Sequence, residues 1–108
     1  MRGWKIEAIP VARPELKSVP RVLKARFFQI SDMLTEHGPL QLGMPHVRYL
    51  EGGLWEMRMK GKSGTARAIY FTVMGKRIIV CSAFVKKSQK TPKKELDKAK
   101  NRMKGFEP

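Results

Sequence analysis

Charged side chains at alternate positions mark one short segment of the chain as a candidate for chemistry. Glu56, Arg58 and Lys60 are spaced by two residues, and apolar methionines separate them. Successive side chains of a β-strand point to opposite faces, so these three must project from one side. Arg67 follows between two alanines in the next apolar segment. An arginine there needs an anion, which is either a carboxylate such as Glu56 or a bound phosphate, and the pattern leaves both open.

A second candidate segment, residues 84–92, places an aromatic residue before clustered lysines and a helix start. Phe84 is suited to stack on a base, and Lys86, Lys87 and Lys90 are suited to neutralise phosphates. The first turn of the helix adds unpaired N–H donors. Alternatively, Phe84 fills the core and the lysines form a solvated loop. The two interpretations have about equal weight.

The histidines and the cysteine form no motif with each other. His46 follows a proline in a loop and is an acid–base candidate near neutral pH, whereas His37 stands where a helix should end. Cys81 lies in an apolar strand and is expected in the core. One cysteine excludes an internal disulfide framework and a cysteine-based zinc site. We therefore expect no metal and no cofactor.

The balance of charge favours a polyanionic partner. The chain has 108 residues, the length of a single domain over 1–108, and 23 Lys and Arg against 9 Asp and Glu give a net charge of +14. Residues 1–54 hold eight basic against five acidic residues, a net of +3, and residues 55–108 hold 15 against four, a net of +11. A merely soluble basic surface is the alternative, although solubility needs only a handful of net charges.

Neither a membrane-spanning run nor a secretory leader is evident in the sequence. No stretch reaches the roughly 18 apolar residues of a membrane span. The first 20 residues alternate charges and prolines and lack an apolar core. With a single cysteine, these features predict a cytoplasmic protein with no membrane association.

Hydrophobic spacing predicts the elements that must position the candidate residues. Leu23, Phe27, Ile30 and Leu34 recur at helical spacing, which predicts a helix over 20–37 with Ser18 near its cap. The other expected elements are a strand over 4–9, a turn of helix or an irregular link over 14–19, a loop over 40–47, strands over 54–60, 65–74 and 77–85, and a final helix with Thr91 as N-cap and Gly105 at its end. Short connections make the last three strands an antiparallel meander.

The order of the expected elements and several short segments resemble the RelE/ParE toxin superfamily, and most closely its phage-derived HigB-like branch. The resemblance covers about residues 4–105. Segment 84–92 carries it most specifically, and segment 54–58, which follows Gly53, carries it moderately. The remaining matches are Arg67, Tyr70, Glu95, Ala99 and Arg102. The implied fold is α+β and RelE-like, with a small antiparallel sheet of an N-terminal strand plus a three-strand meander, packed with an N-terminal helical segment and a C-terminal helix.

The function that the resemblance implies is that of a type II toxin. Such a toxin is a metal-independent, ribosome-dependent mRNA endoribonuclease that arrests translation and is held inactive by a cognate antitoxin, often a helix-turn-helix protein. In its reaction the ribose 2′-OH attacks the adjacent phosphate. The match places Arg58, Arg67, Lys86 and Lys87 in the catalytic basin, with Glu56 and His46 both conceivable as the general base. RNA contacts are expected from Phe84, Lys60, Lys90, Lys93, Lys94 and Lys98. The alternatives are a non-catalytic RNA- or ribosome-binding protein and a ParE-like gyrase inhibitor of the same fold.

Overall fold

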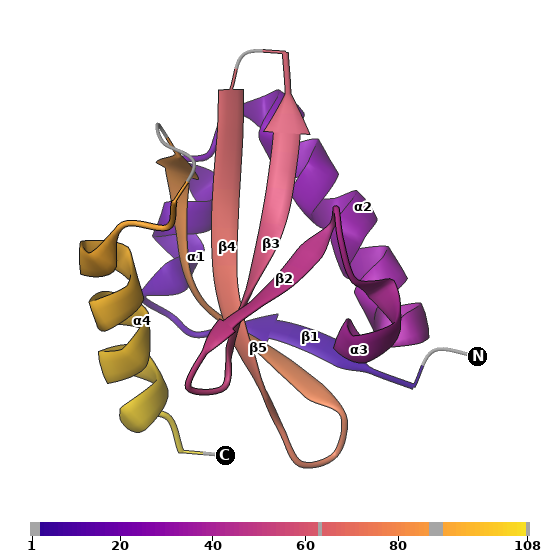
Figure 1. The fold of residues 1–108 in the computed structure, drawn as a ribbon, viewed down its shortest axis with the longest axis vertical. Helices are drawn as coiled ribbons and strands as arrows, with labels where there is room; N and C mark the ends of the chain where they lie inside the picture. Colours follow the sequence, from indigo (N-terminus) through magenta and orange to yellow (C-terminus); the bar gives the residue numbers. More distant parts are fainter. Residues whose placement is uncertain (1–2, 63, 87–89, 108) are drawn as a thin grey trace.

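The computed structural model describes residues 3–62, 64–86 and 90–107. Figure 1 shows a sheet with the long helix α2 on one side and the helix α4 on the other. In chain order the elements are β1 (Lys5–Ala8), α1 (Ala12–Lys17), α2 (Arg21–His37), α3 (Pro39–Leu42), β2 (Val47–Glu51), β3 (Leu54–Gly61), β4 (Gly64–Val73), β5 (Arg77–Lys86) and α4 (Lys93–Lys104).

The sheet is larger and more mixed than the sequence predicted. Within the described residues it has five strands in the order β1-β5-β4-β3-β2. The antiparallel meander of β3, β4 and β5 is confirmed. The expectation of a wholly antiparallel sheet was wrong, because β1 pairs parallel with β5. Three helices and three strands separate these partners in the chain, which is enough chain for a parallel pairing.

The strand β2 was missed because it carries little hydrophobic signal. In this strand Val47 is buried, while Arg48 and Tyr49 are exposed. The Gly52-Gly53 turn does not simply lead into β3, because it closes a hairpin in which Arg48 lies opposite Glu56. The loop predicted over 40–47 is also corrected, since its first residues belong to the short helix α3.

The helix α2 confirms the predicted apolar stripe. Leu23, Phe27, Ile30 and Leu34 are all buried, and they form one cluster with Met57, Met59, Tyr70 and other residues on that face of the sheet. The helix ends as expected at Gly38, whose φ of +83° suits a residue without a side chain. The predicted Ser18 cap was wrong, since the Ser18 hydroxyl donates to the Glu15 carbonyl at 2.9 Å.

The opposite face of the sheet packs against α4. Leu54, Ile69, Phe71, Ile79, Cys81 and Ala99 form this second cluster. The burial of Cys81 confirms its predicted place in the core. Every described helix is too short or too polar to cross a bilayer.

An irregularity in β5 decides which of its side chains meet β4. Ile69 lies opposite Ser82, whereas the next residue, Tyr70, lies opposite Val80, so Cys81 is the extra residue of a β-bulge. Beyond the bulge, Phe84 lies directly opposite Arg67. The bulge therefore aligns the end of β5 with the charged segment of β4.

Candidate nucleic-acid interface

The strand register gathers most of the predicted charged residues on one face of the sheet. Arg58 lies opposite Arg67, which in turn lies opposite Phe84, so these three form a row across β3, β4 and β5. Side chains directly opposite each other in an antiparallel pair share a face. Lys60, Thr65 and Lys86 form the neighbouring row. The prediction that Glu56, Arg58 and Lys60 project from one side of their strand is confirmed, and Arg67 lies on that same side.

Below this surface, Arg67 and Glu56 form a buried ion pair. The Arg67 Nε atom lies 3.3 Å from Glu56 Oε1, and the two side chains are only 3% and 1% exposed. Burial lowers the pKa of Arg67, and the negative charge of Glu56 opposes that effect. Of the two anions open to Arg67 from the sequence, the structure places the carboxylate beside it.

The start of α4 also fastens to Glu56. The Thr91 hydroxyl donates to Glu56 Oε2 at 2.5 Å. Thr91 was expected to cap the helix, but the N-cap is Pro92 and it has no side-chain cap bond. Glu56 thus joins β3 to β4 and to the segment before α4, and this role for Thr91 gave no signal in the sequence.

Lys86 stands beside the buried pair. Its side chain is largely buried, at 7% exposed. Burial lowers the pKa of Lys86, and the positive charge of Arg67 lowers it further, while Glu56 opposes both. An amine with a lowered pKa gives up its proton more readily and so fits proton transfer. Its predicted neighbour Lys87 lies outside the described residues.

Arg48 on the edge strand β2 belongs to the same charged group, although the sequence did not single it out. Its side chain is exposed, and its positive charge lowers the pKa of both Arg67 and Lys86. The missing signal was the strand itself, since only the Gly52-Gly53 hairpin brings Arg48 opposite Glu56.

The half-buried Arg58 connects this face to a pocket of about 190 Å³ between α2 and β3. His46 and Lys60, both predicted as functional, line the same pocket. The Arg58 backbone N–H donates to the His46 carbonyl at 2.9 Å, which fixes the two residues side by side. Arg26 and Gln29 of α2 also line the pocket. They were not predicted, because the hydrophobic spacing of this helix identifies its buried face and gives no signal for its polar one.

The remaining predicted RNA contacts lie apart from this pocket. Phe84 is half-buried and packs against the second apolar cluster. Lys90, Lys93 and Lys94 are exposed at the start of α4. Lys98 is held by two carboxylates, at 3.3 Å from Glu15 and 2.9 Å from Glu95.

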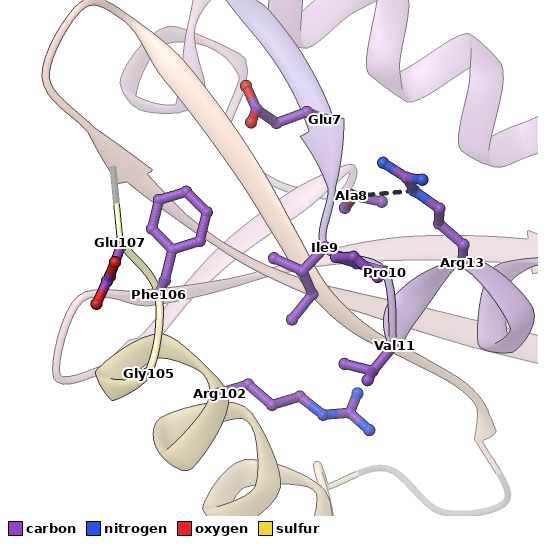
Figure 2. A pocket seen from close by; sticks show the side chains of 10 residues that line it. All are labelled: Glu7, Ala8, Ile9, Pro10, Val11, Arg13, Arg102, Gly105, Phe106 and Glu107. Atoms are coloured by element: carbon purple, nitrogen blue, oxygen red, sulfur yellow. Dashed lines mark hydrogen bonds between the residues drawn. The ribbon is translucent and has the colours of Figure 1, made fainter.

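A larger pocket of about 390 Å³ lies elsewhere, between the end of β1 and the end of α4 (Figure 2). Ile9, Val11 and Phe106 contribute apolar walls, and Glu7 and Glu107 bring negative charge. None of the predicted functional residues lines it. Among the described residues, no three His, Cys, Asp or Glu side chains gather closely enough to hold a metal ion.

Comparison with known proteins agrees with the resemblance read from the sequence. The family model "Phage derived protein Gp49-like" matches residues 14–104. No curated protein is significantly similar in sequence.

Three solved structures share the fold. The Escherichia coli toxin RelE, as an arginine double mutant in the free state, has a TM-score of 0.63 at 14% identity, over 95% of this chain and 99% of that one. A RelBE toxin–antitoxin complex of Mycobacterium tuberculosis gives 0.58 at 15%, over 78% and 99%. The RelE–RelB complex of the archaeon Pyrococcus horikoshii gives 0.56 at 24%, over 77% and 94%. The α+β, RelE-like fold and the place in the RelE superfamily are confirmed.

Proposed function

The chain belongs to the phage-derived Gp49-like family, and from that premise we propose that it is the toxin of a type II toxin–antitoxin pair. We further propose that it is HigB-like, acts as one domain in the cytoplasm, and cleaves mRNA on the ribosome. The excess of positive charge around Arg58 carries this proposal. Arg58 lies directly opposite Arg67 in the strand pair. Arg48 is near enough to lower the pKa of Arg67, and Arg67 in turn lowers the pKa of Lys86. Glu56 is the carboxylate whose charge opposes both shifts.

Such an arrangement favours an anionic ligand. Like charges directly opposite each other in a sheet repel, and one carboxylate does not balance four cations. Glu56 is already occupied by Arg67 and Thr91. The phosphate of a nucleic acid would balance the charge that remains on Arg48 and Arg58.

The proposed reaction is transesterification at one phosphodiester. A general base takes the proton of the ribose 2′-OH, the 2′-oxygen attacks the adjacent phosphorus, and the bond to the 5′-oxygen breaks. A general acid protonates that leaving oxygen, so the products carry a 2′,3′-cyclic phosphate and a 5′-hydroxyl. Arg58 stabilises the negative charge that develops on the phosphate oxygens.

The surroundings of each group favour particular roles in that reaction. Glu56 is buried, with one oxygen bound by Thr91 and the other in ion-pair contact with Arg67, whereas His46 is half-buried in the pocket that Arg58 lines. We therefore assign the general base to His46. Lys86, with its lowered pKa, is the candidate general acid. Arg67 is a positioning residue that holds the strand under Arg58. All of these groups belong to the chain, so the mechanism requires no metal or cofactor.

The proposal also names partners. The structural relatives from Mycobacterium tuberculosis and Pyrococcus horikoshii are toxin–antitoxin complexes. We propose that a cognate antitoxin, of helix-turn-helix type, covers the basic face of this chain between episodes of activity. Opposite charge on the antitoxin would speed association, and the on-rate would fall as salt rises.

Induction of the chain in bacteria, with and without the antitoxin, tests the function. The expected result is growth arrest with mRNA cut at codon-phased positions that depend on translation. Arg58→Ala should strongly reduce the cuts, and Lys104→Ala, which removes an exposed charge at the end of α4, should keep them. Arrest with intact mRNA would overturn the nuclease.

The burial of Arg67 is the observation that favours a non-catalytic alternative, because one predicted catalytic cation is withdrawn from the surface. Purified ribosomes separate the alternatives. Binding to ribosomes without cleavage of mRNA would identify a non-catalytic ribosome-binding protein. Inhibition of DNA supercoiling in a separate gyrase assay would identify a gyrase inhibitor.

A further inference from the structure

The pocket between α2 and β3 is lined by basic and amide side chains without a carboxylate. Arg26 and Gln29 come from α2, His46 precedes β2, and Arg58 and Lys60 come from β3. Segments far apart in the sequence thus bring three cations and a histidine around about 190 Å³. A water molecule takes roughly 30 Å³ of liquid, so the space suffices for a phosphate group and its waters.

The donors in this pocket are oriented toward binding. Arg26 Nη1 donates to Gln29 Oε1 at 3.1 Å, a contact within α2 that holds the guanidinium and leaves its other N–H groups for a ligand. Across the pocket, Arg58 Nη1 donates to the Met44 sulfur at 3.7 Å, and sulfur is a weak acceptor. The Arg58 Nε atom is buried and meets no acceptor among the described residues.

An apolar wall completes the pocket. Ile30, Met33 and Pro45 line it beside the charged groups. A free phosphate ion has no use for apolar surface, whereas a nucleotide presents a phosphate together with a sugar and the face of a base. The combination of a basic rim and an apolar wall therefore fits a nucleotide better than an inorganic ion.

We propose that this pocket is a second phosphate subsite, which binds one nucleotide of single-stranded RNA next to the reacting phosphodiester. The position next to a reacting phosphodiester rests on the proposed function, whereas the binding of RNA in this pocket does not require it. Arg58 lies in the pocket and also in the row with Arg67 and Phe84. A strand bound in the basin would pass Arg58 where β3 extends beyond its last pair with β2, and would round this edge of the sheet to reach α2 on the other side. Arg26 and Lys60 hold its next phosphate, and Gln29 positions Arg26.

Binding of a short 2′-O-methylated oligoribonucleotide, which lacks the attacking hydroxyl, tests the subsite without any cleavage. Arg26→Ala should weaken binding about tenfold or more, as expected for a lost charge-assisted hydrogen bond. It should also reduce the slope of log affinity against log salt by about one. Arg21→Ala is the matched control, because Arg21 is exposed on the same helix but does not line the pocket.

Equal losses in Arg26→Ala and Arg21→Ala would overturn the proposal, because diffuse charge alone would then explain binding. Lys60→Ala provides a second variant and should repeat the loss and the change in salt slope. Gln29→Ala should lower affinity less than Arg26→Ala. The native far-ultraviolet circular dichroism spectrum must be kept in each variant, and exposed positions on α2 are suited to that.

Two further arms separate the possible ligands and the two proposals. Inorganic phosphate should displace the oligonucleotide only through its ionic strength, as a matched chloride solution does, and specific displacement would assign the pocket to free phosphate instead. If Arg26→Ala weakens oligonucleotide binding while the unmodified chain leaves mRNA intact on induction, the subsite stands and the nuclease falls. If mRNA is cut equally well by both chains and binding is unchanged, the subsite falls and the nuclease stands.

Discussion

The Arg67 guanidinium and the Glu56 carboxylate lie 3.3 Å apart between two neighbouring strands, both almost fully buried. Removing one member of such a pair leaves an uncompensated charge in the interior, which is far more costly than replacing both. The pair also lies next to Arg58, the cation we assign to the reacting phosphate, because Arg67 is directly opposite Arg58 in the strand pair. Its first role is therefore to hold β3, β4 and the start of α4 in one arrangement.

Single substitutions in this pair should destabilise the fold. We expect Arg67→Ala to lower the free energy of unfolding by about 3–5 kcal/mol. Glu56→Gln should also be strongly destabilising, because it leaves the guanidinium without its counter-charge. Urea denaturation measures both. Arg77→Ala is the control, since its pair with Glu7 is far more exposed than the Arg67–Glu56 pair and should contribute much less. Wild-type stability in Arg67→Ala would show that the pair is not structural.

Strong local patterns were sufficient to predict much of the fold. The helical stripe from Leu23 to Leu34 and the alternation along β3 are periodic patterns that arise because one face of each element is buried. The strand β2 and the helix α3 were not predicted, because neither produces a periodic apolar pattern. The strand lies at the edge of the sheet with exposed side chains, and the helix is a single turn. The parallel pairing of β1 with β5 depends on contacts between distant segments, which no local pattern encodes.

The candidate site was predicted in its residue types better than in its geometry. Arg58 and Arg67 are on the same face because side chains alternate regularly along both strands and the register pairs these two residues. The burial of Arg67 could not be predicted, because it accompanies contacts between distant segments, in which Glu56 pairs with Arg67 and accepts a bond from Thr91. Arg48 lies in a segment with no predicted strand, and Arg26 lies in a helix whose pattern indicates only its apolar face.

The stability of the fold should fall in acid through Glu15. Its carboxylate accepts bonds from the Ala83 backbone N–H, from Lys98 and from both Nη atoms of Arg102. Burial raises the pKa of Glu15, but these bonds outweigh it and hold the pKa below the usual value of 4.5. The stabilisation is thus fully present above about pH 4.5 and is lost as the pH falls through the lower, folded value.

Glu15→Gln tests this dependence. We expect it to lower stability at pH 7 by about 1–3 kcal/mol and to flatten the acid side of the stability profile. Chemical denaturation across a pH series measures the effect. Glu36→Gln removes an exposed carboxylate and should leave the profile unchanged. A profile of equal slope in Glu15→Gln and the parent would contradict the role of Glu15.

The single thiol should be inert in the native protein. Cys81 is fully buried, and burial raises the pKa of its thiol to about 12. The thiolate is the reactive form, so alkylation at pH 8 requires unfolding. We expect iodoacetamide to label Cys81 in urea but not in buffer, as followed by mass spectrometry. Rapid labelling in buffer would mean that α4 opens readily from the sheet.

Arg58 should be the cation whose loss removes cleavage without removing the fold. Its side chain is half-buried, and no described carboxylate lies within ion-pair distance of it, so Arg58→Ala should keep a Tm near that of the parent. If it stabilises charge that develops on the phosphate, the cleavage rate on programmed ribosomes should fall by roughly 10²–10³, by analogy with the loss of one oxyanion donor. Arg58→Lys should recover part of the rate, because the charge remains but the bidentate geometry does not. Lys98→Ala, which removes a lysine already held by Glu15 and Glu95, should change cleavage per folded molecule little. Should a folded Arg67→Ala lose cleavage while Arg58→Ala keeps it, the charge-stabilising role would pass from Arg58 to Arg67, and the buried pair would have to open when RNA binds.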